Sequence, residues 1–258
     1  MASDPESLVP MPTLTPKQQE IRDRERQILD VARTILIERG YLGLTMELIA
    51  EAMGCSKGTI YQHFTCKEDI SAALVKETAC KRTELFEKAS TFRGRTRERM
   101  TAIGIAADIF VRLYPQHFQT ETLVAYSSIR EKVGPRIIES LRDQEFRCMV
   151  IAAGIVRDGI AQGDLELPED VSPEQLTFGM WTMSIGSYLI LTSGAPIDRV
   201  GIERPLDALM RNYQAMLDGY RWAPLTEAWN YEETVRRILQ EVFAEEDKEV
   251  SLLPDPGW

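Results

Sequence analysis

The chain has 258 residues, of which 44% are hydrophobic and 27% charged, and its formal net charge at pH 7 is −10. The length fits two modest domains or one domain with a large appendage, and the composition is that of a soluble globular protein. The absence of an apolar run of about 18 residues excludes a membrane-spanning helix. The N-terminal residues lack the basic and apolar regions of a secretory signal, so we expect a cytoplasmic protein.

The negative charge is concentrated in the C-terminal part of the chain. Residues 1–99 hold 16 Lys and Arg against 15 Asp and Glu, whereas residues 100–258 hold 14 against 25. DNA phosphates would repel the acidic part, while the N-terminal part is nearly neutral and carries individually placed cations. This distribution excludes a protein that coats nucleic acid and favours a small DNA-reading domain on an acidic body.

The pattern along the chain predicts helices throughout. Residues 1–16 are rich in Pro, Ser and Thr without periodicity, which predicts a disordered tail. A first helix is expected from Lys17 to about Arg39, where Gly40 supplies a left-handed stop. Further helices are expected over residues 67–90, 96–113, 117–130, 135–161, 172–192, 203–219 and 226–246. Without any alternating strand, the predicted fold class is all-α, and residues 247–258 are expected to form a flexible tail.

Residues 40–64 carry the pattern that indicates a function. Thr45 is placed to cap one short helix, and Ser56 to cap a second whose apolar side includes Ile60. Gly54 between them can adopt the positive φ of a tight turn. Two short helices joined in this way form a helix-turn-helix, whose second helix enters the major groove of DNA. Taken alone, the pattern also fits a helical hairpin in a core.

Gly58 lies in the first turn of the second short helix. Glycine disfavours a helix there by about 1 kcal/mol relative to alanine. We interpret its presence as a requirement for close approach, because a side chain would hold the backbone away from DNA. Ala50 marks the point where the two short helices approach each other closely, so a bulky residue would force them apart.

Residues 25–75 resemble the TetR family of transcriptional regulators. The residues that match the family pattern are Gly40-Tyr41, Thr45, Ile49-Ala50, Gly54-Cys55-Ser56-Lys57-Gly58-Thr59-Ile60-Tyr61-Gln62-His63-Phe64 and Lys67. Cys55 departs mildly from the branched apolar residue that is more common there. The resemblance implies a helix-turn-helix DNA-binding domain over residues 17–66 and a helical ligand-binding and dimerisation domain over residues 67–246. Beyond residue 75 or so the resemblance is architectural only.

The resemblance implies roles for the polar residues of this segment, and their chemistry supports these roles. The candidates for contacts to base edges are Ser56, Lys57, Thr59 and Gln62. Lys suits the O6 and N7 atoms of guanine, and Gln suits N6 and N7 of adenine. The candidates for contacts to phosphates are Thr45, Gly58, Tyr61, His63 and Lys67.

Two other patterns are not assigned to binding. Arg93, Arg95, Arg97 and Arg99 follow the helix expected over residues 67–90, which in this architecture leads away from DNA, so we expect a solvated loop. The four cysteines and two histidines lack metal-ligand spacing, and neither a metal ion nor a cofactor is expected. A thiol switch at Cys55 and Cys66 remains an alternative to their being ordinary reduced thiols.

The C-terminal helices contain large apolar and polarizable residues of the kind that line pockets between helices. In TetR-like proteins the inducer binds among these helices, which makes a hydrophobic or aromatic inducer the better hypothesis. The pocket candidates are Phe110, Tyr114, Tyr126, Met149, Trp181 and Met183. Ordinary core packing is the alternative role for each of them.

Residues 178–191 are apolar nearly all round and so must be buried on several sides. Together with the amphipathic residues 203–219, they resemble the pair of helices through which the family dimerises. The dimer-interface candidates are Gly179, Gly186, Leu206 and Tyr213. The expected helix over residues 226–246 is additional to a minimal member of the family, and it either shields the interface or extends it.

These observations predict a homodimeric transcriptional repressor that binds palindromic operator DNA and is released by a small-molecule inducer. A TetR-like activator and a helical adaptor that does not bind DNA are the alternatives. An enzyme is excluded, because the chain offers no nucleophile–base pair, metal cluster or phosphate loop.

Overall fold

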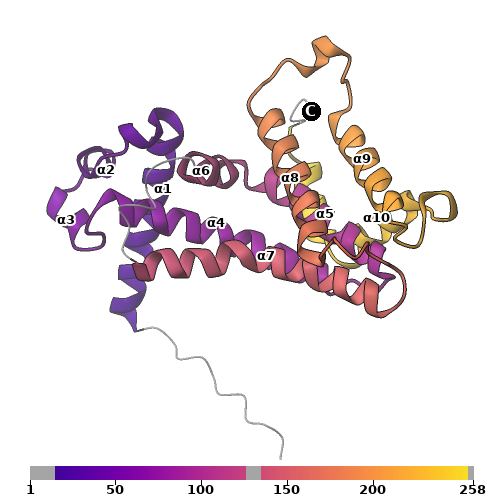
Figure 1. Cartoon of the computed structure of the whole chain (residues 1–258). Helices are drawn as coiled ribbons and strands as arrows, with labels where there is room; N and C mark the ends of the chain where they lie inside the picture. The colour runs from indigo at the N-terminus through magenta and orange to yellow at the C-terminus, as the bar shows by residue number, and fades with distance from the viewer. Residues whose placement is uncertain (1–14, 126–134, 255–258) are drawn as a thin grey trace, which may run out of the picture. The chain divides into compact units, whose positions relative to one another are not determined.

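The structure is a computed structural model that describes residues 15–125 and 135–254 (Figure 1). All regular secondary structure within these ranges is helical, which confirms the predicted all-α fold. The chain forms two compact units, one up to Ala73 and the other from Leu74, so the division falls inside a helix and later than the expected boundary after residue 66. No helix in the described ranges combines the length and apolar character needed to cross a membrane.

Helix α1 (Pro16–Gly43) begins at a capping box. The Thr15 hydroxyl oxygen accepts a hydrogen bond from the Gln18 backbone N–H at 3.3 Å, and the Gln18 side chain accepts one from the Thr15 N–H at 2.9 Å. Pro16 occupies the first helical position, where its missing N–H leaves no bond unmade. Residues 15 and 16, expected to belong to the disordered tail, are therefore the cap and first turn of α1.

The first unit packs α1 against α2 (Met46–Ala52), and α2 against α3 (Lys57–Tyr61), with the start of α4 (Lys67–Ser90) included in the same unit. Its fully buried apolar residues are Ile28, Ala32, Leu36, Leu44, Ile49, Ile60 and Ile70. Gly40 interrupts α1 with φ 67° and ψ 177°. The expected positive φ is therefore present, but the ψ angle is not that of a left-handed helix.

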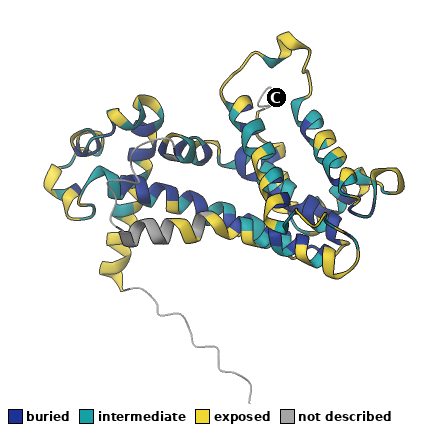
Figure 2. Ribbon diagram, in the orientation of Figure 1, coloured by how far each residue is buried: buried dark blue, intermediate teal, exposed yellow. Residues whose placement is uncertain are grey.

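The second unit contains the remainder of α4 and all later helices. They are α5 (Thr96–Leu113), α6 (Pro115–Ala125), α7 (Pro135–Ala161), α8 (Pro173–Thr192), the short 3₁₀ helix η2 (Ile197–Val200), α9 (Pro205–Gly219), a second 3₁₀ helix η3 (Thr226–Ala228), α10 (Tyr231–Glu241) and α11 (Ala244–Ser251). Helix α5 is central, since it contacts α6, α7, α10 and α11. Helices α8 and α9 carry mostly half-buried and exposed residues (Figure 2).

The chain after α9 differs from the single helix expected over residues 226–246. It forms η3, α10 and α11, and Phe243 between the last two helices is fully buried. Helix α11 continues to Ser251, and its Val250 is also buried. The expectation of a flexible tail from residue 247 is therefore wrong for 247–251. The reason is that two apolar side chains anchor a stretch whose many charges are typical of a solvated tail.

Arg97 is fully buried, although the sequence placed it in a solvated loop. It lies in the first turn of α5. Its guanidinium donates hydrogen bonds to the Asp218 carboxylate at 2.6 Å and to the backbone oxygens of Trp222 and Pro224 at 2.7 and 2.9 Å. It also donates to the Gln214 side chain at 2.6 Å. Arg97 therefore ties the end of α9 and the following loop to α5.

We expect Arg97→Met to destabilise the second unit. The variant would take one donor from the Asp218 carboxylate, which keeps its hydrogen bonds from Thr226, and would leave the oxygens of Trp222 and Pro224 without the Arg97 donor. Since each buried acceptor left unpaired costs about 1–3 kcal/mol, the free energy of unfolding should fall by about 3 kcal/mol. Chemical denaturation of the full chain, followed by far-UV circular dichroism, measures the loss.

Arg95→Met is the matched control, because Arg95 also pairs with a carboxylate, that of Asp164, but its side chain is 52% exposed. We expect a change below about 1 kcal/mol for this variant. Equal losses for the two variants would contradict the assigned role of Arg97.

Candidate functional site

The turn between α2 and α3 has the geometry expected of a helix-turn-helix. The Thr45 hydroxyl accepts a hydrogen bond from the Leu48 N–H, and the Ser56 hydroxyl accepts one from the Thr59 N–H, each at 3.2 Å. Gly54 has φ 62°, a value that L-residues with a side chain rarely adopt. These local interactions start both helices at the predicted residues and fix the tight turn between them.

The buried side of α3 determines which residues face outward. Ile60 is fully buried, and it packs in the same core as Ile49 and Ala50 of α2. With Ile60 turned inward, three of the four base-contact candidates, Ser56, Lys57 and Gln62, are exposed, and Thr59 is half-buried. Three of the four predicted base-contact residues are therefore exposed along α3 and its caps, on a surface that we call the α3 edge.

Lys57 on this edge forms an ion pair that the sequence did not indicate. Its Nζ lies 2.5 Å from Oε1 of Glu47, in the first turn of α2. The side chains of both residues remain about half exposed, at 55% for Lys57 and 53% for Glu47. The hydrogen bond from Lys57 lowers the pKa of the Glu47 carboxyl. The exposed edge therefore presents a cation and an anion side by side.

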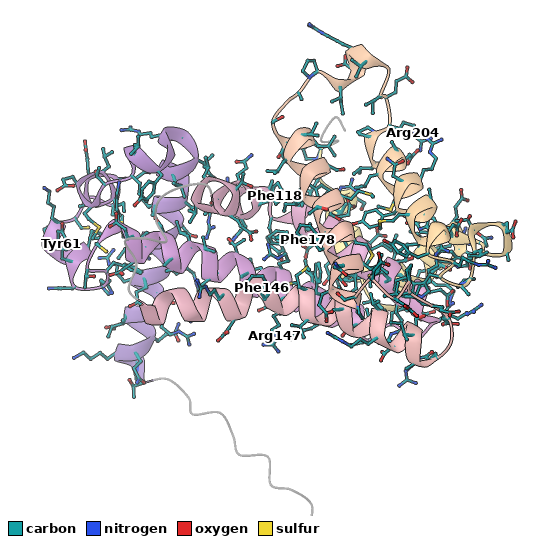
Figure 3. The ribbon with its side chains drawn as sticks, in the orientation of Figure 1. Tyr61, Phe118, Phe146, Arg147, Phe178 and Arg204 are labelled. Atoms are coloured by element: carbon teal, nitrogen blue, oxygen red, sulfur yellow. The ribbon has the colours of Figure 1, made fainter. Side chains whose placement is uncertain are left out.

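The phosphate-contact candidates differ in how far they are exposed to solvent. The Tyr61 side chain on α3 is the most accessible, with 50% of its surface exposed (Figure 3). His63 is only 13% exposed, and its Nδ1 lies 3.7 Å from a carboxylate oxygen of Glu25. Thr45 is half-buried and caps α2, as described above. Its exposure makes Tyr61 the clearest candidate in this set.

Lys67 is held in place by Tyr41, a residue of the motif for which the sequence suggested no individual role. Its Nζ donates a hydrogen bond to the backbone oxygen of Tyr41 at 3.2 Å and lies 4.3 Å from the centre of the Tyr41 ring. The Tyr41 hydroxyl in turn donates to Glu68 at 2.7 Å. Burial, and then this bond to Glu68, raise the pKa of Tyr41. The Gly40-Tyr41 pair of the motif thus positions Lys67, whose ammonium group keeps further hydrogens for a phosphate.

Gly58 is exposed, and the protein itself leaves room for a side chain there. A Cβ atom at this position would meet only the Ser56 hydroxyl, at the ordinary contact distance of 3.6 Å. Internal packing therefore does not require glycine at Gly58. This leaves an external reason, which agrees with close approach of the backbone to another molecule.

Cys55 and Cys66, the alternative redox pair, are both half-buried and free. Burial raises the pKa of the Cys66 thiol. Since the thiolate is the reactive form, a raised pKa disfavours a thiol switch at this position. In the described part of the chain, no three side chains of the metal-ligand type lie close enough to share an ion.

The residues predicted to line a ligand pocket differ in how far they are buried. Phe110 is buried in the core, and Tyr114 is half-buried with its ring centre 6.0 Å from that of Phe110. Met149 and Met183 are half-buried, whereas Trp181 is 46% exposed. Tyr126 lies outside the described residues. Trp181 therefore borders solvent in the single chain.

A set of polar groups near Phe110 and Tyr114 was missed by the sequence analysis. The Arg82 guanidinium donates to both carboxylate oxygens of Glu121, at 2.6 and 2.5 Å, and lies 5.9 Å from the centre of the Phe110 ring. His117 stacks edge-on against Tyr114 with ring centres 5.8 Å apart. These residues come from α4, α5 and α6, so only the fold brings them together. The hollow lined by Ile160, Leu165 and Pro168 after α7 involves none of them.

Two of the four dimer-interface candidates are engaged within the single chain. The Tyr213 hydroxyl on α9 is hydrogen-bonded to Ser184 and to the backbone oxygen of Met180, both on α8. A Cβ at Gly179 would lie 3.9 Å from the Met216 sulfur, so Gly179 also faces α9. A Cβ at Gly186 would meet nothing, and Leu206 is half-buried. Tyr213 and Gly179 therefore contact the neighbouring helix of the same chain, so part of the predicted interface is used within a single chain.

Comparison with known proteins supports the interpretation of the first unit. The sequence model of "Bacterial regulatory proteins, tetR family" matches residues 28–74. This range contains α2, α3 and the polar edge described above. Over these residues the chain matches the TetR family of bacterial regulatory proteins.

Individual relatives divide into those similar over the helix-turn-helix and those similar over more of the chain. The "HTH-type transcriptional repressor AcnR" of Corynebacterium diphtheriae is 38% identical over 66 residues, or 26% of this chain and 35% of that protein. The alignment thus spans about a third of that relative. The "Fatty acid metabolism regulator protein" of Bacillus subtilis is 27% identical over 170 residues, or 66% of this chain and 85% of that protein.

Solved TetR-family structures share the fold of the described chain. The regulator PfmR from Thermus thermophilus superposes with a TM-score of 0.59 at 19% identity, covering 74% of this chain and 97% of that one. Such a likeness concerns the fold alone. The relatives named above are transcriptional regulators and not enzymes, which agrees with the exclusion of catalysis from the sequence.

We expect Gly58→Ala to separate stability from DNA binding. Because the new methyl group has room and alanine favours a helix, the free energy of unfolding should stay unchanged or rise by up to about 1 kcal/mol. Affinity for a selected duplex should fall roughly tenfold, the equivalent of about 1.4 kcal/mol. Thermal unfolding and a fluorescence-anisotropy titration measure the two effects.

Gly54→Ala is the control for Gly58→Ala, since φ at Gly54 is 62° and alanine there would be strained by about 1 kcal/mol or more. That variant should lose stability. Unchanged DNA affinity in Gly58→Ala would remove the external reason for the glycine.

Proposed function

We propose that this chain is a transcriptional repressor that binds palindromic operator DNA as a homodimer and is released by a small molecule. The observation that carries the DNA-binding part is the outward edge of α3, where Ser56, Lys57 and Gln62 are exposed beside a glycine that internal packing does not require. Side chains of these types can read base edges in the major groove. A helical adaptor would not need such an edge.

Repression is favoured over activation by the relatives, several of which are named transcriptional repressors. Their similarity covers the helix-turn-helix, so it supports the mode of DNA binding more directly than the outcome for transcription. A repressor needs only to occupy its operator and to leave it, whereas an activator needs in addition a surface that contacts the transcription machinery. Repression is therefore the simpler proposal.

Dimerisation is supported by an apolar surface that we call the α7–α8 face. It consists of Phe146, Val150, Phe178 and Trp181, which are all large, apolar and exposed. Phe146 and Phe178 are labelled in Figure 3. Phe178 and Trp181 form an edge-to-face pair with ring centres 6.0 Å apart. Exposed clusters of large apolar side chains are typical of protein interfaces.

Contacts between α7 and α8 support treating the four residues as one face. Phe146 and Val150 lie one turn apart on α7, and Phe178 and Trp181 lie about one turn apart on α8. The two helices contact each other, and Arg157 near the end of α7 forms an ion pair with Glu174 at the start of α8. A second copy of the chain would cover this face, and the resulting dimer would carry the two α3 helices that a palindromic operator requires.

The spacing of the two α3 helices would then determine affinity for DNA. Recognition helices about 34–36 Å apart reach successive major grooves on one side of the duplex, and identical subunits read a palindrome. A ligand that binds better to a dimer with another spacing lowers DNA affinity by its differential affinity for the two states.

For the ligand we propose an apolar or aromatic molecule that carries a polar group. Phe110 and Tyr114 supply apolar surface, and the Arg82–Glu121 pair lies beside Phe110 with side chains less than one-fifth exposed. The named function of the Bacillus subtilis relative, a regulator of fatty acid metabolism, agrees with a ligand of that kind. Titrating such a ligand with and without operator DNA measures the coupling, and equal affinities would contradict induction.

Selection of duplexes from a random library tests the DNA-binding proposal. We expect the full chain to enrich a palindromic motif and the triple variant of Lys57, Thr59 and Gln62 to alanine to lose it, because those side chains face the bases. Tyr61→Phe should keep the motif but bind every site more weakly, since a phosphate contact carries no sequence information. An unchanged motif in the triple variant would contradict the assignment.

Trp181→Glu tests the dimer proposal. A charge in the middle of the α7–α8 face should shift the chain towards monomer in sedimentation velocity and weaken operator binding at least tenfold, because a monomer reads only one half-site.

Ile190→Glu is the matched control for Trp181→Glu. It places the same charge on α8 at a similarly exposed position, 50% against 46% for Trp181. It points to the opposite side of the helix, since nine residues turn the helix by about half a revolution. A dimer that survives Trp181→Glu, or one that is lost equally in both variants, would contradict the role of the α7–α8 face.

A further inference from the structure

The ion pair between Glu47 and Lys57 lies on the surface that the proposed function presents to DNA. Glu47 belongs to α2 and Lys57 is the first residue of α3, so the pair bridges the two helices of the motif. Both side chains are about half exposed, and 2.5 Å separates Lys57 Nζ from Glu47 Oε1. A duplex that reaches Lys57 must therefore also meet the Glu47 carboxylate.

A carboxylate at this place limits which duplexes can bind. An ionised carboxylate only accepts hydrogen bonds, and phosphates repel it. Among the base edges of the major groove, the only donors are the amino groups N4 of cytosine and N6 of adenine. If Glu47 does not meet one of these groups, it is brought into the groove with its outward oxygen unpaired, and binding is weakened.

Lys57 further limits which base pair can lie against the Glu47–Lys57 pair. Its ammonium group has three hydrogens, so it can keep one on Glu47 and direct the others to guanine O6 and N7. A G·C pair presents two acceptors on guanine followed by the donor on cytosine, which matches a cation and an anion side by side. In an A·T pair the donor lies between two acceptors, which does not match that order.

We propose that Glu47 is a specificity-determining residue, which accepts a hydrogen bond from cytosine N4 while Lys57 binds the paired guanine. This inference rests on the proposed function, because it assigns a role within the DNA contact. Glu47 and Lys57 act as one unit that reads a single base pair in each half-site. An exposed ion pair contributes little to stability, so the fold does not depend on it.

The test is duplex selection from a random library by the full-length chain, with Glu47→Gln compared with the unaltered protein. We expect the unaltered protein to enrich a motif with an invariant G·C pair in each half-site. In Glu47→Gln the preference for that pair over the other three should fall about tenfold, the size of one base-edge contact. The remaining positions of the motif should keep their preferences.

Glu51→Gln is the matched control, since Glu51 lies one turn further along α2 and is exposed. It removes the same charge, so the two variants should show the same change in binding to unrelated duplexes. Only Glu47→Gln should change the motif. Adding Glu47→Gln to Lys57→Ala should weaken the preference at the G·C position by less than tenfold, because Lys57 also positions Glu47 and the effects of coupled residues are not additive.

The outcomes separate this inference from the proposed function. If Lys57→Ala alters the motif and Glu47→Gln does not, Glu47 is not a specificity residue, but the DNA-binding proposal stands. An adenine in place of the cytosine would overturn the G·C assignment. If the unaltered protein enriches no motif, the proposed function fails and this inference fails with it. Circular dichroism of each variant verifies that the fold is intact.

Discussion

The burial of Ile60 is the constraint on which the proposed DNA contact depends. Helix α3 has only five residues, and it can bury one side only where α2 offers a surface for it. Gly54, with its positive φ, and the two hydroxyl caps bring the helices close enough for this packing. Once Ile60 is inside, the direction of every other side chain on α3 is determined, because successive residues turn about 100° around the helix axis. The polar edge is therefore a consequence of apolar packing behind it.

The polar side chains around this edge that are candidates for DNA contacts are already engaged within the protein. Lys57 pairs with Glu47, His63 faces Glu25, and Lys67 contacts Tyr41. A phosphate or a base that binds them must compete with those partners. This arrangement suits a chain with a net charge of −10, since a surface of unpaired cations would bind any nucleic acid at low salt. Charge pairing on the protein lowers its non-specific attraction for DNA. Recognition of a DNA sequence then depends more on which base edges can replace the internal partners of these side chains.

The first unit could be predicted closely from the sequence, because its determinants are local. The caps at Thr45 and Ser56, the turn at Gly54 and the inward face at Ile60 each depend on residues within a few positions of one another. What could not be predicted there are contacts between separate helices, such as Lys57 with Glu47. Those contacts depend on the angle at which two helices meet. No spacing in a single sequence encodes that angle.

In the second unit the determinants are long-range, and the chemical type of a residue was a poor guide to its position. Arg97 lies inside because the end of α9 and the loop after it supply a carboxylate and backbone oxygens to its guanidinium, more than a hundred positions along the chain. Trp181 lies outside because α8 packs on α7 and α9 through its other sides. The same reasoning applies to α11, where Val250 reaches a buried position despite the charges around it. An exposed tryptophan in a chain that buries an arginine indicates a surface shaped for another partner, since leaving so much apolar area in water is unfavourable for the isolated chain. The exposure of Trp181 in the single chain therefore supports a dimer formed through the second unit.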